Sequence, residues 1–379
     1  MASSWDEALK RWTAAGLIDS ALEQNIRNWE AANNPQRSTD RFVALLFGFG
    51  GLLLMAGAFL FVAAHWEALG PGSRYTLVLA VLALFHVAGA YASRKMPHLA
   101  TVLHSVGTAF LGAGIFLCGQ IFNMAEHWPG ALLLWAAGAA CGWALLRDWP
   151  HALWLAILVP TWLWGEWIED VGRGPSDLQN MVPLVGTLVL AFVYLAAPRG
   201  DHAPTWRLAV SRLGAVALIP ACIAVGIVHE SSYSMAERHA MPVLQGQILP
   251  WSIALGLPLA LGAILMGRRA AYLILPVLWS IALAQFSWHD SADKIALYAL
   301  YIVGAFLVAI WGIKEQRRSC INLGVIGFAL TLMFFYFSDV YDKLGRSLGL
   351  IGMGIVFLGG GWALERVRRR LLANMKGAR

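Results

Sequence analysis

Apolar residues occur in long runs along most of this chain, and short polar links separate the runs. A helix needs roughly 20 residues, and at least about 17, to cross the hydrocarbon core of a bilayer. The pattern therefore predicts an all-α polytopic membrane protein with about twelve transmembrane helices. The fourth and sixth runs are short, which leaves ten or eleven full crossings as an alternative. The expected spans are residues 42–64, 75–92, 99–120, 130–146, 151–168, 182–197, 208–228, 249–266, 270–287, 295–313, 320–338 and 347–364.

The positive charges favour one orientation of these spans. If the N-terminus lies in the cytoplasm, 22 of the 28 Lys and Arg residues fall in the cytoplasmic tails and links. Links on the cytoplasmic side of membrane proteins carry such an excess, so both termini are expected to be cytoplasmic. The net charge of +6 is spread over these links and forms no groove, and no nucleic-acid partner is expected. A content of 59% hydrophobic residues agrees with the membrane class, in which the lipid bilayer is the first partner.

The chain divides into three parts, namely a tail at 1–41, a transmembrane bundle at 42–364 and a basic cytosolic tail at 365–379. The first tail predicts a small cytosolic helical hairpin, in which Gly16 ends one helix and Asp19 caps the next. The hairpin is too short to have a core of its own. We expect its Trp-bearing face to rest on the bundle or on lipid headgroups, and a docking surface for a cytosolic partner is the alternative.

The tail and the first span carry a recognisable combination of residues. The tail contains Trp12 and the run 16–19, which reads Gly-Leu-Ile-Asp. The first span contains several glycines and continues into 61–69, which reads Phe-Val-Ala-Ala-His-Trp-Glu-Ala-Leu. This combination resembles the uncharacterised bacterial membrane family catalogued as domain of unknown function 2157, although that family usually has Asn where this chain has His65. The resemblance implies a multi-pass protein of the bacterial inner membrane with a cytosolic helical tail, and it implies no activity.

Two histidines fall in the central zones of expected spans. His86 lies about nine residues before the centre of the link 93–98, and His104 lies about nine residues after it. At a rise of 1.5 Å per residue, both imidazoles should lie at nearly the same depth. Such a pair suits a hydrogen bond, a proton relay or ligation of a haem iron from opposite sides. Two unrelated histidines, each bonded to a nearby carbonyl, are the alternative.

A second group of candidate residues falls in or beside the expected outer links, where histidines and tryptophans adjoin acids. Imidazole and carboxylate together suit a cationic ligand, a proton relay or a divalent metal. An ordinary solvated boundary is the alternative. No HxxxH or HExxH spacing is present, so no metal or other cofactor is expected, with haem and a divalent metal kept as alternatives. The candidate ligand-binding residues are His65, Trp66, Glu67, Glu126, His127 and Glu166.

Prolines such as Pro160, Pro250 and Pro258 lie inside or at the ends of expected spans. Broken membrane helices often line binding cavities. The leading hypothesis is therefore a protein that binds or transports a small or lipid-like ligand through an outward-opening cavity. A membrane-embedded enzyme or redox component and a scaffold subunit of a membrane complex are the alternatives. No motif identifies a catalytic residue, which disfavours an enzyme.

Overall fold

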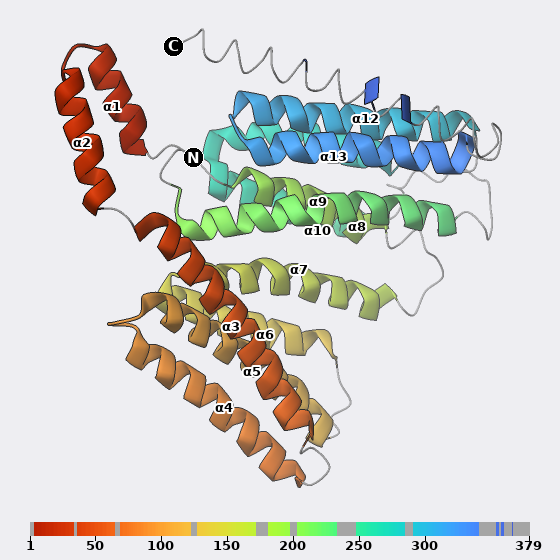
Figure 1. Cartoon of the computed structure of the whole chain (residues 1–379). Coiled ribbons are helices and arrows are strands. Elements are labelled where there is room, and N and C mark those ends of the chain that lie inside the picture. The colour runs from red at the N-terminus through yellow and green to blue at the C-terminus, as the bar shows by residue number, and fades with distance from the viewer. Residues whose placement is uncertain are drawn as a thin grey trace. The chain divides into compact units, whose positions relative to one another are not determined.

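The computed structural model describes residues 4–33, 36–64, 69–122, 127–171, 181–197, 203–232, 248–284 and 291–340, with a few single positions between 354 and 366. Over these ranges every regular element is helical and none is a strand (Figure 1). The expected all-α fold is thereby confirmed. The chain forms two compact units, Met1–Met124 and Ala125–Arg379. Each unit is described by itself.

The first unit begins with the two short helices expected in the tail. Gly16 has a φ of +68° between them, a conformation that favours glycine. The backbone N–H of Leu22 donates to Asp19 Oδ1 at 2.6 Å, which is the expected cap. The third helix begins before the expected boundary at residue 42. The helices of this unit are α1 (Ser4–Ala14), α2 (Ser20–Asn33), α3 (Gln36–Ala64), α4 (Pro71–Ala92) and α5 (Pro97–Phe122).

The hairpin of α4 and α5 contains the core of the first unit. Val78 and Phe85 of α4 are buried against Val106 and Phe110 of α5. The rings of Phe85 and Phe110 stack with centroids 5.8 Å apart. On α1 and α2, by contrast, Trp12 and Trp29 are exposed, so the tail presents an aromatic surface.

The second unit is built from antiparallel helix pairs, and α6 with α7, α8 with α9, and α12 with α13 are in extensive contact. Its central helix is α8, which is buried along its whole length and packs against α7, α9, α10 and α11. The helices are α6 (Pro129–Leu146), α7 (Trp149–Val171), α8 (Met181–Ala196), α9 (Thr205–Ser232), α10 (Ile248–Met266), the 3₁₀-helix η2 (Gly267–Leu273), α11 (Ile274–Leu283), α12 (Ser291–Lys314), α13 (Arg318–Phe335) and the π-helical turn η3 (Tyr336–Val340).

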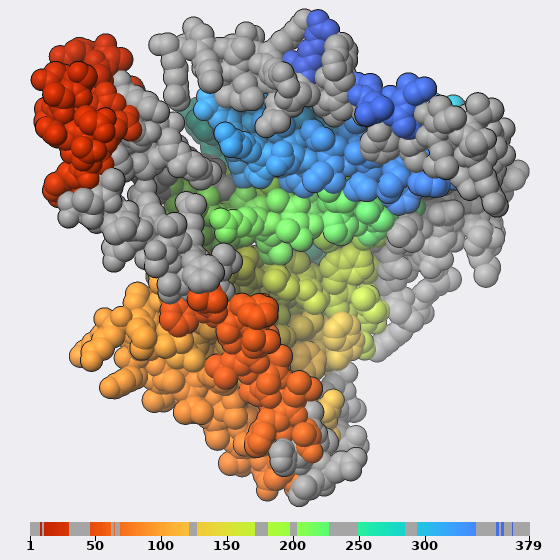
Figure 2. Space-filling view, in the orientation of Figure 1, coloured from red at the N-terminus to blue at the C-terminus, as the bar shows by residue number. Residues whose placement is uncertain are grey.

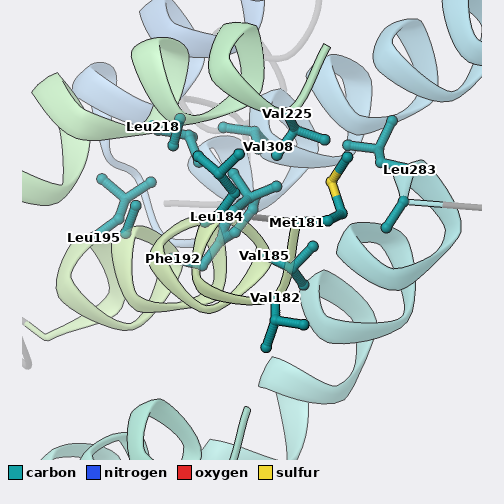
Figure 3. Packing of buried hydrophobic residues seen from close by; sticks show 14 of the residues in the cluster. Met181, Val182, Leu184, Val185, Phe192, Leu195, Leu218, Val225, Leu283 and Val308 are labelled. Carbon is teal, nitrogen blue, oxygen red and sulfur yellow. The ribbon is translucent and has the colours of Figure 1, made fainter. Parts of the chain in front are cut away.

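Figure 3 shows how the core of this unit surrounds α8. Met181, Val185 and Phe192 of α8 meet Leu218 and Val308 of neighbouring helices. A helix that is hydrophobic on every side is buried on every side, which explains why α8 has no solvated or lipid-facing stripe. The remaining helices keep one apolar face on the outside of the unit. Figure 2 shows the continuous surface formed by α12 and α13, coloured blue.

Among the described residues, seven helical segments are long and apolar enough to cross a membrane. Shorter apolar helices cover Leu46–Phe61 and Met181–Ala196. The expected total of about twelve spans is not confirmed. In place of one continuous helix over 270–287, the structure has η2 followed by α11, which is only 10 residues long. The expected span at 347–364 lies almost wholly outside the described residues.

Candidate functional site

A cavity of about 770 Å³ lies among α7, α8 and α10, and His127 also lines it. Binding pockets for small molecules commonly have 300–1,000 Å³, so this cavity has a suitable size. Its walls are largely apolar, and its ionisable groups belong to the start of α6 and the C-terminal end of α7. The cavity is lined by His127, Pro160, Leu163, Trp164, Glu166, Trp167, Glu169, Asp170, Val182, Pro183, Gly186, Thr187, Leu190, Leu249, Pro250, Ile253, Ala254, Leu257 and Pro258.

Prolines interrupt the helices that form the cavity wall. Pro160 lies inside α7 and has no N–H, so it cannot donate to the carbonyl of Ala156. The hydroxyl of Tyr194 on α8 donates to that carbonyl at 2.9 Å instead. The proline therefore breaks one hydrogen bond within α7, and a side chain of the neighbouring helix replaces it. This exchange fixes α7 against α8 at the cavity.

Pro258 has the same effect in α10, where it leaves the carbonyl of Ala254 without its usual helical donor. Gly186 of α8 lies directly opposite, because a Cβ at that position would be 2.9 Å from the Ala254 oxygen. Glycine is therefore required for this close approach. Ala254 and Gly186 both line the cavity, so this close approach of α8 and α10 lies at its wall.

Glu166 is held in place at the mouth of the cavity by two contacts. Its Oε1 accepts a hydrogen bond of 2.6 Å from Trp162 Nε1. Its Oε2 lies 2.6 Å from His127 Nε2. The side chains of His127 and Glu166 are 56% and 35% exposed, so the pair lies at the polar boundary of the unit. Two residues expected at the ligand site are thus in direct contact.

The Asp, Glu, Lys and Arg side chains in the described wall of the cavity are all of one sign, because all of them are acidic. Glu166, Glu169 and Asp170 supply three carboxylates, and none of the described lining residues is Lys or Arg. Trp164 and Trp167 add aromatic rings, and Trp164 Nε1 donates to Thr187 Oγ1 at 2.8 Å. The buried Nε1 of Trp167 has no hydrogen-bond partner within the described part of the chain. Carboxylates with aromatic walls are suited to a cation.

Not every expected ligand residue is placed by the structure. His65, Trp66, Glu67 and Glu126 lie outside the described residues. The acid in contact with His127 is Glu166, which was also among the expected ligand residues. Glu169 and Asp170 line the cavity but were not among the expected ligand residues. Their i, i+3 and i, i+4 spacing from Glu166 was the available signal.

His86 and His104 meet between α4 and α5. Their Nδ1 atoms are 3.1 Å apart and their ring centroids 5.4 Å apart. One Nδ1 must carry a hydrogen and the other must accept it, so the two rings are in different tautomeric roles. The distance is that of a direct hydrogen bond and leaves no room for an iron between these two atoms. Whether the pair has a functional role is still a prediction.

Each of these imidazoles packs over a glycine of the opposite helix. A Cβ at Gly89 would lie 2.9 Å from His104 Nε2, and a Cβ at Gly107 would lie 2.7 Å from His86 Nε2. The sequence repeats the same unit on both helices, as His86-x-x-Gly89 and His104-x-x-Gly107. Because α4 and α5 are antiparallel neighbours, the two units interlock reciprocally. We call these four residues the histidine clasp.

Replacing Gly89 with alanine is expected to lower the free energy of unfolding by about 1–2 kcal/mol, because the new Cβ displaces the His104 ring. Thermal unfolding of the purified protein measures the loss, and imidazole ¹⁵N shifts report the broken contact with His86. Gly114→Ala in α5 is the control, since its Cβ would meet only Val78 Cγ1 at an ordinary 3.5 Å. Equal melting temperatures for the two variants would contradict the clasp.

Comparison with known proteins supports one classification. Residues 10–164 match the family described as Predicted membrane protein (DUF2157). The resemblance predicted from the tail and the first span is thereby confirmed. No curated protein and no solved structure matches the sequence. The family match and the seven apolar helices identify the chain as a membrane protein, and the match adds no activity.

The DUF2157 segment includes the histidine clasp, His127 and the proline in α7, whereas the three cavity acids follow it. It also includes a further histidine that the sequence did not single out. His151 is fully buried, and its Nδ1 lies 2.6 Å from Asp148 Oδ1. The same carboxylate oxygen accepts from the His151 backbone N–H at 3.3 Å, near the start of α7. The Asp-x-x-His spacing at a helix start was the available signal.

Metal ligation is the remaining chemistry that histidines and acids suggest. Within the described ranges, no group of three or more His, Cys, Asp or Glu side chains is arranged to hold a metal ion.

Proposed function

We propose that this membrane protein binds a small organic cation in the cavity of α7, α8 and α10, as a receptor or as the first step of transport. The observation that carries the proposal is the lining itself, which combines three carboxylates with tryptophan rings and no described Lys or Arg. Carboxylates attract the positive charge, and aromatic faces stabilise it where water is excluded. The apolar remainder of the wall suits the hydrocarbon part of such a ligand.

The orientation expected from the charge distribution supports an outward-opening cavity. The acids at the end of α7 adjoin the link 172–180, in which Arg173 is the one basic residue, and the link 233–247 before α10 likewise contains only Arg238. At the opposite ends of these helices lie Arg147, Arg207 and Arg268, which belong to the links expected in the cytoplasm. The ligand would therefore reach the site from outside the cell, in a bacterial inner membrane with both termini cytoplasmic.

Two ions of one shape and opposite charge test the proposal directly. Tetraphenylphosphonium and tetraphenylborate have nearly the same size, so the difference in their affinity isolates the charge of the site. We expect the purified protein in a non-ionic detergent to bind the phosphonium at least about tenfold more tightly than the borate. Equilibrium dialysis of both radiolabelled ions measures this ratio. Equal affinities would overturn the proposal.

Neutral variants of Glu169 and Asp170, the two cavity acids that follow Glu166 on α7, locate the binding. Each charge about 4 Å from a ligand is worth about 1 kcal/mol even in bulk water, so Glu169→Gln with Asp170→Asn should weaken phosphonium binding about tenfold or more. Glu315→Gln is the control, because this exposed acid removes a charge without lining the cavity. Unchanged phosphonium binding in the double variant contradicts the assignment. Uptake of the phosphonium into proteoliposomes then distinguishes a carrier from a receptor.

A further inference from the structure

A second cavity, of about 530 Å³, lies among α9, α12 and α13, with Trp279 of α11 on its wall. It is separate from the first cavity, with which it shares no lining residue. The second cavity is lined by Phe192, Leu218, Ile219, Cys222, Ile223, Gly226, Trp279, Lys294, Tyr298, Tyr301, Gly304, Ala305, Val308, Leu323, Gly324, Gly327, Leu330, Thr331, Phe334 and Ser338.

The charge of the second cavity is the reverse of the first. Lys294 supplies a positive charge, and none of its described lining residues is Asp or Glu. Lys294 is half-buried near the start of α12, and Tyr298 lies one turn further along the same face. Ser338, just after α13, lies at the same end of this antiparallel pair. One end of the cavity therefore combines an ammonium group with hydroxyl groups.

The remainder of the cavity is apolar and bordered by small residues. Gly304, Ala305 and Val308 of α12 face Gly324 and Gly327 of α13. Hydroxyl groups along this part are already used within the protein, since Tyr301 donates to Cys222 O at 3.0 Å and Thr331 to Gly327 O at 2.8 Å. The deep part of the cavity is thus an apolar slot, in which the hydroxyl groups of Tyr301 and Thr331 already donate hydrogen bonds within the protein.

The length of the slot matches a lipid chain. From Lys294 to Val308 the helix rises about 21 Å, at 1.5 Å per residue. One leaflet of a bilayer has about 15 Å of hydrocarbon, half of the total thickness. An alkyl chain that begins at the ammonium group therefore remains beside lining residues over its whole length. A compact hydrophilic anion would leave most of this wall without a partner.

We propose that the second cavity holds one alkyl chain of an anionic amphiphile, with its carboxylate or phosphate on Lys294. A free fatty acid and an anionic membrane phospholipid share this chemistry. The ammonium group donates to the anionic head, and the apolar wall takes the chain out of water. The membrane protein then has two binding sites of opposite charge in one unit, and each site serves as an internal control for the other.

Photo-crosslinking of the full-length protein tests the site. A diazirine analogue of palmitic acid and the matching fatty alcohol are added to the purified protein in a non-ionic detergent. We expect the acid to label peptides of α12 and α13 at least about tenfold more strongly than the alcohol, because loss of a charged hydrogen bond costs about one decade in affinity. Label distributed over other helices, or equal labelling by both probes, would overturn the proposal.

Two variants test the contacts of the ligand's anionic head and of its alkyl chain separately. Lys294→Gln should reduce acid labelling to the level of the alcohol, and Lys314→Gln, at the opposite and exposed end of α12, should leave it unchanged. Gly327→Leu should lower labelling by both probes, since its Cβ starts at an ordinary 3.6 Å from Ala305 and the rest of the side chain enters the slot. Full acid labelling of folded Lys294→Gln protein would remove the proposed role of the ammonium group.

Competition identifies the source of the amphiphile. Displacement of the acid probe by oleate alone indicates a free fatty acid, and displacement by dioleoyl phosphatidylglycerol indicates a membrane lipid. Displacement by neither contradicts the shared chemistry. Glu169→Gln, which alters the first cavity, should leave acid labelling unchanged. With this variant, the test of the second cavity does not depend on whether the first cavity binds an organic cation.

Discussion

Replacing Gly214 with alanine is expected to lower the free energy of unfolding by about 3 kcal/mol or more. Gly214 of α9 packs directly on the backbone of α8. A Cβ at this position would lie 2.5 Å from the backbone N of Leu195 and 2.6 Å from the Ala191 carbonyl oxygen. Backbone atoms of a fully buried helix cannot rotate away as the end of a side chain can. The two helices must therefore separate, and the core around α8 loosens with them.

The matched control is Gly256→Ala in α10. Gly256 is exposed, and a Cβ there meets no other atom within 4 Å. Alanine is a better helix former than glycine by about 1 kcal/mol, so this variant should be neutral or slightly more stable. Thermal unfolding of both variants in the same detergent, followed by circular dichroism, gives the comparison. A Gly214→Ala protein that melts with the Gly256→Ala protein would show that α8 and α9 are not in backbone contact.

Hydropathy predicted the bounds of a helix closely where the residues at both ends of an apolar run stop the helix. The expected span 130–146 corresponds to α6, Pro129–Leu146, and the span 182–197 corresponds to α8, Met181–Ala196. In the first case a proline starts the helix, and Arg147 follows it with a φ of +53°. Such boundaries are local properties of the sequence. A method based on local sequence therefore finds them.

Hydropathy placed the break between the spans at Gly267-Arg268-Arg269 but did not predict the change of helix type that follows it. After α10 the chain turns at Gly267, which has a φ of +57°, and continues as a 3₁₀-helix before α11 begins. The run at 270–273, Ala-Ala-Tyr-Leu, is apolar, as is the α-helix that follows, and mean hydropathy does not distinguish the 3₁₀ form from the α form. The sequence therefore predicted one long helix at 270–287.

The candidate sites were also predicted only in part from the sequence. The common depth of His86 and His104 followed from the helical rise and their distances from one link, and the structure brings the two rings together. Their facing direction depends on the glycines opposite each ring, which only the packed helices reveal. The contact between His127, just before α6, and Glu166 of α7 joins residues far apart in the sequence, so adjacency in sequence did not predict it.

Opposite charges in the two cavities have a common structural cause. Both cavities lie beside α8 or its partner α9, where the second unit is most tightly packed, and the ionisable groups line only one end of each. Charged side chains are costly in the hydrocarbon region and are tolerated at its boundary. The acids near the end of α7 and the lysine near the start of α12 therefore set the charge of each cavity without disturbing the shared core.

Replacing Arg317 with alanine is expected to lower the free energy of unfolding by about 2–3 kcal/mol, the range for hydrogen bonds to a charged group. Arg317 lies in the link between α12 and α13. Its Nη1 donates to Leu195 O at 2.5 Å, and its Nη2 donates to Ser211 Oγ at 2.6 Å. Ser211 Oγ donates in turn to Leu195 O at 3.1 Å. One guanidinium thus ties together the end of α8, the start of α9 and the α12–α13 link.

Lysine at this position keeps the positive charge and loses the planar fork, so Arg317→Lys should recover only part of the stability. Arg318→Ala is the control, because Arg318 is the exposed neighbour at the start of α13 and its replacement removes the same charge. Thermal unfolding in detergent ranks the three variants. We expect Arg318→Ala to melt near the unaltered protein, Arg317→Lys below it and Arg317→Ala lowest. If charge alone stabilised this end of the unit, the two alanine variants would melt together, and the contact to Leu195 and Ser211 would carry no stability.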